Sequence, residues 1–299
     1  MEYSLLWRIR PFEIHKNGDF VGHKQPLFSR IVMENRTPEP LRTIEITYQT
    51  AEMIPPPYAH RYTLKGTINR ADELHITFTI QYIDRQDLTD EEIQAEGFTG
   101  TDDFEWQGTL LPVWSSEIRD LVSKTDFYKS ARPTSDSENQ FWLTLDYRND
   151  EEPLVGKPKN RDAWEYLSQE LIQAIYETAR LESPLKLIYL KKTPRDKTIQ
   201  LEMNVFFAKR TVRTRMQVGD TEKTKELGWE SLNPILRLIY AGEFLAEKAV
   251  EKEPQHQGRF LNLGDGLWYE FGKALVNPSG NNRFLNDVER TFDQLSEQE

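Results

Sequence analysis

The chain has 299 residues, enough for one large domain or two ordinary domains, each able to bury a core without a metal or a disulfide. It contains no cysteine, which excludes disulfides, thiolate metal sites, cysteine nucleophiles and redox switches. Its 38 basic and 49 acidic residues give a net charge of −11, which favours solubility and argues against general coating of nucleic acid.

The sequence contains no signal for a membrane or for export. No apolar run approaches the roughly 18 residues that a membrane span requires. The first residues have neither the basic region nor the long apolar region of a signal peptide. We therefore expect a cytoplasmic protein that does not enter a membrane.

Apolar and polar residues alternate in four runs of the first half, as in antiparallel strands with one wet face. These runs are 44–49, 61–68, 74–84 and 141–148. Between the third and fourth runs, residues 86–105 contain eight carboxylates and two glycines, which indicates an excursion from the sheet. A short helix is expected at 116–124.

The segment 149–161 is rich in proline, glycine and mixed charges, and it is the best boundary in the sequence. After it the apolar period becomes helical, with a helix expected from Asp162 to Ser183. Strands are expected at 185–189 and 199–207. Three helices should close the chain: one after Asn233, one from Asp265 to Asn277, and one at 285–295.

These elements predict an α+β fold with a largely antiparallel sheet in the N-terminal half and helices concentrated in the C-terminal half. Residues 1–150 form a β-rich region, and residues 162–299 form an α+β region with a basic strand pair and three C-terminal helices. The two regions are either separate domains or one continuous domain.

A weak internal similarity links two segments of the chain. Residues 106–112 and 229–234 each run from a tryptophan to a proline, after a strand and before a helix, with spacings that differ by one residue. Either the two halves arose by duplication, or a tryptophan near a helix start recurs by chance.

Positive charge is concentrated in one stretch of the chain. Residues 186–225 contain eleven Lys/Arg and four Asp/Glu, so this stretch carries +7 while the remainder carries −18. If the strand continues past residue 207, alternate side chains place Lys209, Arg213 and Arg215 in a row on one face and Arg210 on the other. Lys191 and Lys192 extend this surface from the preceding turn.

Three interpretations of this basic surface remain open. It is an edge strand protected by charge against unwanted pairing, a contact for an acidic protein surface, or a contact for nucleic acid. Trp142 is a second lead, because it lies on the polar side of its strand and exposed tryptophans are frequent contact anchors. A second layer covering that face would instead make Trp142 part of the core.

No motif with a strong catalytic mechanism is present, and none of the five histidines has another at metal-ligand spacing. We expect no metal and no cofactor. The sequence favours a non-catalytic binding or assembly component that recognises another, acidic protein through the basic strand surface. The alternative is a nucleic-acid-binding protein, or a divalent-metal-dependent hydrolase of a phosphorylated substrate that uses carboxylates of 87–105.

Overall fold

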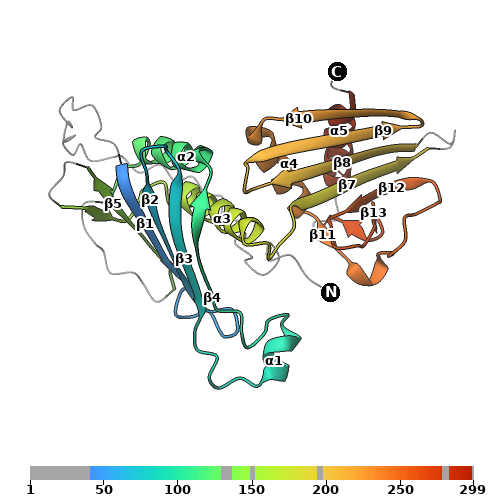
Figure 1. Ribbon diagram of the computed structural model, residues 1–299. Coiled ribbons are helices and arrows are strands. Elements are labelled where there is room, and N and C mark those ends of the chain that lie inside the picture. Colours follow the sequence, from blue (N-terminus) through green and yellow to red (C-terminus); the bar gives the residue numbers. More distant parts are fainter. Residues whose placement is uncertain (1–40, 129–136, 149–151, 194–197, 278–282, 298–299) are drawn as a thin grey trace, which may run out of the picture. The chain divides into compact units, whose positions relative to one another are not determined.

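The structure is a computed structural model that describes residues 41–128, 137–148, 152–193, 198–277 and 283–297. It contains helices and two six-stranded antiparallel sheets, so the predicted α+β class is confirmed. The prediction that helices concentrate in the C-terminal half is wrong, because each half has its own sheet and its own helices (Figure 1). The chain divides into two compact units within helix α3, between Ile172 and Gln173.

The first unit contains a sheet of strand order β4-β3-β2-β1-β5-β6. Its strands are β1 (Leu41–Gln49), β2 (His60–Ile68), β3 (Leu74–Tyr82), β4 (Phe104–Leu110), β5 (Gln140–Tyr147) and β6 (Leu154–Gly156). Its helices are α1 (Asp90–Ala95), α2 (Pro112–Ser123) and the part of α3 (Arg161–Thr178) that ends at Ile172. The excursion between β3 and β4 carries α1 and extends beyond the ends of these strands (Figure 1).

Alternation along the strands gives this sheet one apolar face. Ile46, Leu64, Phe78 and Leu143 lie on that face and are buried. Trp114 and Ile118 of α2, and Trp164 and Leu171 of α3, are buried on the helical side. The opposite, open face presents polar side chains.

The second unit contains a sheet of strand order β10-β9-β8-β7-β12-β13. Its strands are β7 (Leu185–Lys192), β8 (Thr198–Phe206), β9 (Thr211–Val218), β10 (Thr221–Leu227), β12 (Gly258–Asn262) and β13 (Tyr269–Glu270). The other elements are η2 (Trp229–Ser231), α4 (Leu232–Tyr240), β11 (Glu243–Phe244), η3 (Ala246–Lys248), β14 (Leu275–Val276) and α5 (Arg283–Glu297).

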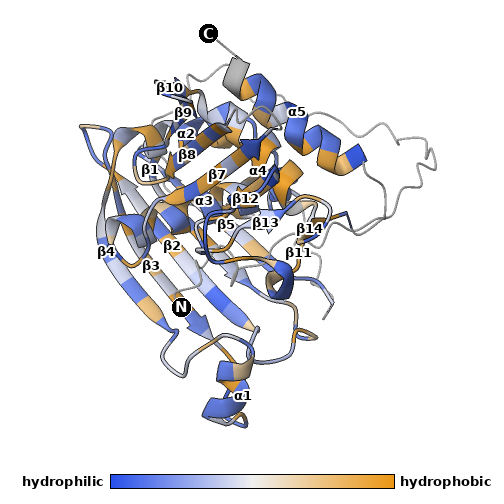
Figure 2. Cartoon of the chain, turned by 90° about the vertical axis from the view of Figure 1, so that its right-hand side faces the viewer, coloured by the Kyte–Doolittle hydropathy of each residue, from blue (hydrophilic) through white to orange (hydrophobic). Residues whose placement is uncertain are grey.

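Helix α5 packs on the second sheet through aromatic and ionic contacts. Figure 2 shows hydrophilic and hydrophobic segments alternating along α5, as in an amphipathic helix. The ring of Phe292 stacks on Tyr189 of β7, with 4.9 Å between ring centroids. This helix confirms the one predicted at 285–295.

The helix predicted from Asp265 to Asn277 is wrong. Its apolar residues occur at helical spacing, but the chain there forms the two short strands β13 and β14. Gly266 and Gly272 adopt positive φ angles of 81° and 80°, which break a right-handed helix, and Leu275 pairs with Phe244. Pairing with distant strands therefore overrides the local period.

The two units repeat one topology. In each six-stranded sheet, the first four strands form a meander, a helix follows the fourth, and the fifth strand of the sheet pairs with the first. Helix α3 follows the sixth strand of the first sheet directly, whereas in the second unit β14, which pairs with β11, lies between β13 and α5. Pro112 and Pro234 lie in the first turns of the two equivalent helices, whereas Trp106 lies within β4 and Trp229 lies after β10. The common topology favours the duplication hypothesis, while the tryptophans are not equivalent.

Within the described residues, no helix has both the length and the apolar composition needed to cross a bilayer.

Candidate partner-binding surfaces

The predicted row of cations is shorter than expected. Lys209 and Arg210 lie in the turn between β8 and β9, where Arg210 has a positive φ of 53°. Only Arg213 and Arg215 stand on β9 with their side chains on the open face of the second sheet. The expectation that the strand continues directly past Phe207 is therefore wrong.

The arginines of β9 have carboxylate partners on both neighbouring strands. Arg213 forms an ion pair of 3.2 Å with Glu226 of β10. Arg215 lies 3.0 Å from Glu202 of β8 and 3.9 Å from Glu222 of β10. Lys186 of β7 also reaches Glu202, at 3.0 Å. These three cations thus face three glutamates.

Glu202 is the centre of this network. Its burial alone would raise its pKa, but hydrogen bonds from Asn204, Lys186 and Arg215 outweigh burial and lower the pKa. The carboxylate therefore stays charged and keeps both cations paired.

Lys191 and Lys192 point to opposite faces of β7, and both have partners. The Nζ of Lys191 lies 2.6 Å from Asp293 and 3.1 Å from Glu289 of α5. Lys192 reaches Glu253 at 3.3 Å. These two lysines hold α5 and the chain after η3 against the sheet.

The remaining predicted cations contact aromatic rings. The guanidinium of Arg210 lies 5.2 Å from the ring centroid of Trp229, and Lys209 lies 5.9 Å from that of Phe206. The structure therefore does not gather the six predicted basic residues into one surface, and partner binding by them stays a prediction.

Trp142 lies on the polar side of β5, as the alternation in the sequence predicted. Pairing across the sheet aligns Glu105, Thr79, Thr63, Thr47 and Trp142 in one row. The ring is half-buried, and the ammonium of Lys157 lies 4.9 Å from its centroid. Helices α2 and α3 pack on the opposite face of this sheet, so they do not cover Trp142 (Figure 1).

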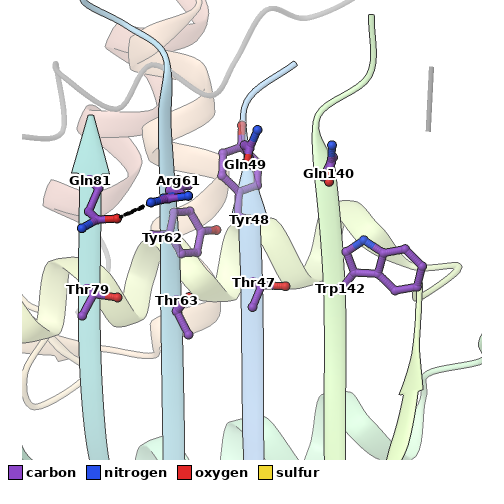
Figure 3. Close-up of a pocket in the computed structure, with 10 residues that line it drawn as sticks. All are labelled: Thr47, Tyr48, Gln49, Arg61, Tyr62, Thr63, Thr79, Gln81, Gln140 and Trp142. Atoms are coloured by element: carbon purple, nitrogen blue, oxygen red, sulfur yellow. Dashed lines mark hydrogen bonds between the residues drawn. The ribbon is translucent and has the colours of Figure 1, made fainter. Parts of the chain in front are cut away.

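A shallow hollow of about 190 Å³ lies beside Trp142 at one end of this face (Figure 3). It is lined by Thr47, Tyr48, Gln49, Arg61, Tyr62, Thr63, Thr79, Gln81, Gln140 and Trp142. The lining offers hydroxyl and amide groups, one guanidinium and one indole, but no carboxylate.

Arg61 is held in place within this hollow. Its Nε and Nη2 donate hydrogen bonds of 3.0 and 2.9 Å to Oε1 of Gln81, directly opposite on β3 (Figure 3). A second hollow of about 470 Å³ adjoins the first and shares Gln49 and Arg61 with it. Glu52 and Asp84 line the second hollow only.

The sequence did not single out Arg61 or Gln81. Arg61 lies on the polar side of a clearly alternating strand, which was the available signal. Its fixed orientation depends on the register between β2 and β3, and no local pattern encodes that register.

The acidic excursion is an ordered structure built around Arg85. Its guanidinium donates to the carbonyl oxygens of Pro57 and Thr99, pairs with Asp102 at 3.1 Å, and lies 4.0 Å from the ring centroid of Tyr82. Thr89 and Glu92 form a capping box at the start of α1. In the described part of the chain, no three metal-ligating side chains come together.

Comparisons of the chain with models of protein families, with curated proteins and with solved structures find no match.

Proposed function

We propose that the protein is a non-catalytic binding component that recognises an acidic, extended segment of another protein at the hollow beside Trp142. The observation that carries the proposal is one oriented guanidinium and one indole in a hollow whose other lining residues present hydroxyl and amide groups. The proposed partner is still an acidic protein, but the proposed surface moves from β9 to β2 and β5.

Arg61 suits a carboxylate of the partner. Gln81 binds only Nε and Nη2, so Nη1 is directed elsewhere while the planar group stays oriented. An oriented guanidinium binds a carboxylate with better geometry than a flexible ammonium. The first hollow has no carboxylate of its own to compete with the partner.

Trp142 suits an apolar side chain of the same segment. Arg61 and Trp142 lie two strand spacings apart across the sheet and one row apart along it. These offsets correspond to about 12 Å, which an extended peptide spans in three to four residues. The expected motif is a carboxylate separated from an apolar side chain by that distance.

Strand β9 is less suitable, both for an acidic protein and for a nucleic acid. Arg213 and Arg215 already face glutamates, so an acidic partner would have to displace ion pairs within the sheet. A nucleic acid would need a continuous row of unpaired cations, which the described side chains of β9 do not form.

The test is selection of binding peptides from a random display library on the wild-type chain, followed by measurement of affinity for variants. Arg61→Gln should weaken binding about tenfold or more, because a hydrogen bond between charged groups is lost. Trp142→Ala should also weaken it. Lys65→Gln is the matched control, since Lys65 lies on the same face of β2 outside the hollow and should change affinity less than twofold.

Selected peptides without carboxylates, or equal affinity for Arg61→Gln, would contradict the proposal. If charge reversal at Arg213 and Arg215 abolished peptide binding and charge reversal at Arg61 did not, the binding site would lie on β9, as the sequence predicted. Binding of single-stranded DNA that weakens steeply with salt would favour the nucleic-acid alternative.

A further inference from the structure

Strand β4 forms one edge of the first sheet, and no further described strand pairs with its outer side. Its seven residues, Phe104–Leu110, contain a single charge, that of Glu105. Long edge strands with little charge are templates for pairing with another chain, and proteins usually protect them. The outer side of β4 is therefore suited to pairing with another strand.

The hydrogen bonds within the sheet determine which groups of β4 point outward. At the two ends of the β2–β3 ladder, Asn69 N donates to Glu73 O and Ile83 N donates to Ala59 O. The odd-numbered residues of β3 thus bond to β2, and its even-numbered residues bond to β4. The partners of those even residues are Phe104, Trp106, Gly108 and Leu110. The backbone groups of Glu105, Gln107 and Thr109 consequently point away from the sheet.

We propose that a second copy of this chain pairs with this edge, β4 against β4, about a two-fold axis at Gln107. In this antiparallel register Gln107 lies opposite Gln107 of the second copy, and Glu105 lies opposite Thr109 twice. All three outward-pointing residues then exchange backbone hydrogen bonds, six in total for the pair of strands. The two sheets become one continuous sheet.

The side chains are self-complementary in the same register. On the helical side, Trp106 lies opposite Gly108 of the second copy and Phe104 lies opposite Leu110. An aromatic residue across from a glycine covers the exposed backbone there. Gly108 is already in contact with an indole within its own strand, because a Cβ placed on it would meet the ring of Trp106 at 2.2 Å. No like charges are opposed.

The equivalent edge strand of the second unit gives the opposite result. The two-residue turn after Val218 pairs it with Thr221, so Glu222, Thr224 and Glu226 point outward on β10. Pairing two β10 strands about Thr224 would oppose Glu222 to Glu226 and Lys223 to Lys225. Like charges directly opposite are destabilising, so this edge is protected from the pairing that β4 permits.

The proposal does not depend on the partner site, since Arg61 and Trp142 lie on β2 and β5. The first test is the molar mass of the full chain by sedimentation or light scattering across a concentration series. We expect twice the chain mass for the wild type. Gln107→Pro removes an outward N–H and should give the monomer, whereas Thr224→Pro makes the same change on β10 and should leave the dimer intact.

Because the chain has no cysteine, a single introduced cysteine gives a clean second test. Residues facing each other in a hydrogen-bonded antiparallel pair have Cα atoms about 5.5 Å apart, within the range of a disulfide. Gln107→Cys should form a covalent dimer on mild oxidation of a dilute sample, and Thr224→Cys should not.

Gln107→Lys covers the case in which the proline variant does not fold, because it opposes two lysines without changing the backbone. It should lower the association constant while the circular dichroism spectrum stays that of the wild type. A wild-type chain that is monomeric throughout the series, a dimer that survives Gln107→Lys, or equal cross-linking of the two cysteine variants would overturn the proposal.

Discussion

Strands β4 and β10 hold the same position in two sheets of the same topology, yet their edges differ in chemistry. Four of the seven residues of β10 are charged, and one of the seven residues of β4 is charged. All six residues from Thr221 to Glu226 are exposed, whereas Phe104, Trp106 and Gly108 of β4 are half-buried. The comparison teaches that the topology alone does not determine whether a sheet edge can pair with another chain. The side chains of the edge strand determine it, and they differ between the two units.

The open faces of the two sheets differ in the same way. On the first sheet, threonine and glutamine side chains surround one oriented arginine and Trp142. On the second sheet, Lys186, Arg213 and Arg215 are paired with glutamates of neighbouring strands. The three cations of the second sheet are therefore paired with carboxylates, whereas Arg61 of the first sheet is oriented by the amide of Gln81.

The largest effects are expected from the cores of the two units. Trp164 of α3 and Phe292 of α5 hold equivalent helices against the two sheets, and both are buried. Trp164→Ala and Phe292→Ala should each destabilise their own unit by about 3–5 kcal/mol. In calorimetry, each variant should lower the midpoint temperature of a different unfolding transition. A single transition that both variants shift equally would contradict independent units.

A smaller effect should follow from removing charge at β10. Lys223→Thr with Lys225→Thr abolishes two opposed lysine contacts, each costing about 0.2–1 kcal/mol, so self-association through β10 should strengthen roughly two- to thirtyfold. Sedimentation in a Gln107→Lys background isolates this edge from β4. Lys223→Arg with Lys225→Arg keeps the charge and should not associate. Unchanged association of the threonine variant would show that charge does not protect β10.

The smallest effect concerns the response of the two units to acid. His60 lies between the rings of Tyr48 and Tyr82, and burial lowers its pKa below the ordinary 6.5. The unfolded chain therefore binds this proton first as the pH falls. The resulting stability is complete above pH 6.5 and declines as the pH falls through the interval down to the lowered pKa.

His60→Gln should flatten the loss of stability of the first unit on acidification below pH 6.5. His256→Gln is the control in the second unit, because the side chain of His256 is 59% exposed. Urea unfolding at a series of pH values gives both responses. Equal slopes for the wild type and His60→Gln would remove His60 from the acid response.

Several features followed from local pattern. The alternation in 61–68 and 74–84 predicted strands that the structure contains as β2 and β3, and alternation in 141–148 placed Trp142 on the polar side of β5. The apolar stripe at 285–295 predicted α5. These features could be predicted because side-chain period and burial on one face are properties of a single element.

Other features depended on residues far apart in the chain. Strand β10 was missed because glutamates occupy one of its faces and lysines the other, so no alternation of apolar and polar residues marks it. The helix expected at 265–277 was wrong because the segment pairs with β11 and β12. The basic row was overestimated because Glu202 and Glu226, which balance it, lie on other strands.

The sequence by itself determined the α+β class, the faces of individual strands and helices, and the absence of cysteine chemistry. Only the tertiary structure decided that the second half forms a sheet equivalent to the first, that Arg213 and Arg215 meet glutamates, and that Gln81 orients Arg61. The physical reason is that a strand reveals its two faces locally, whereas its neighbours and register arise from pairing across the sheet. The same pairing leaves the backbone of Gln107 pointing outward from β4.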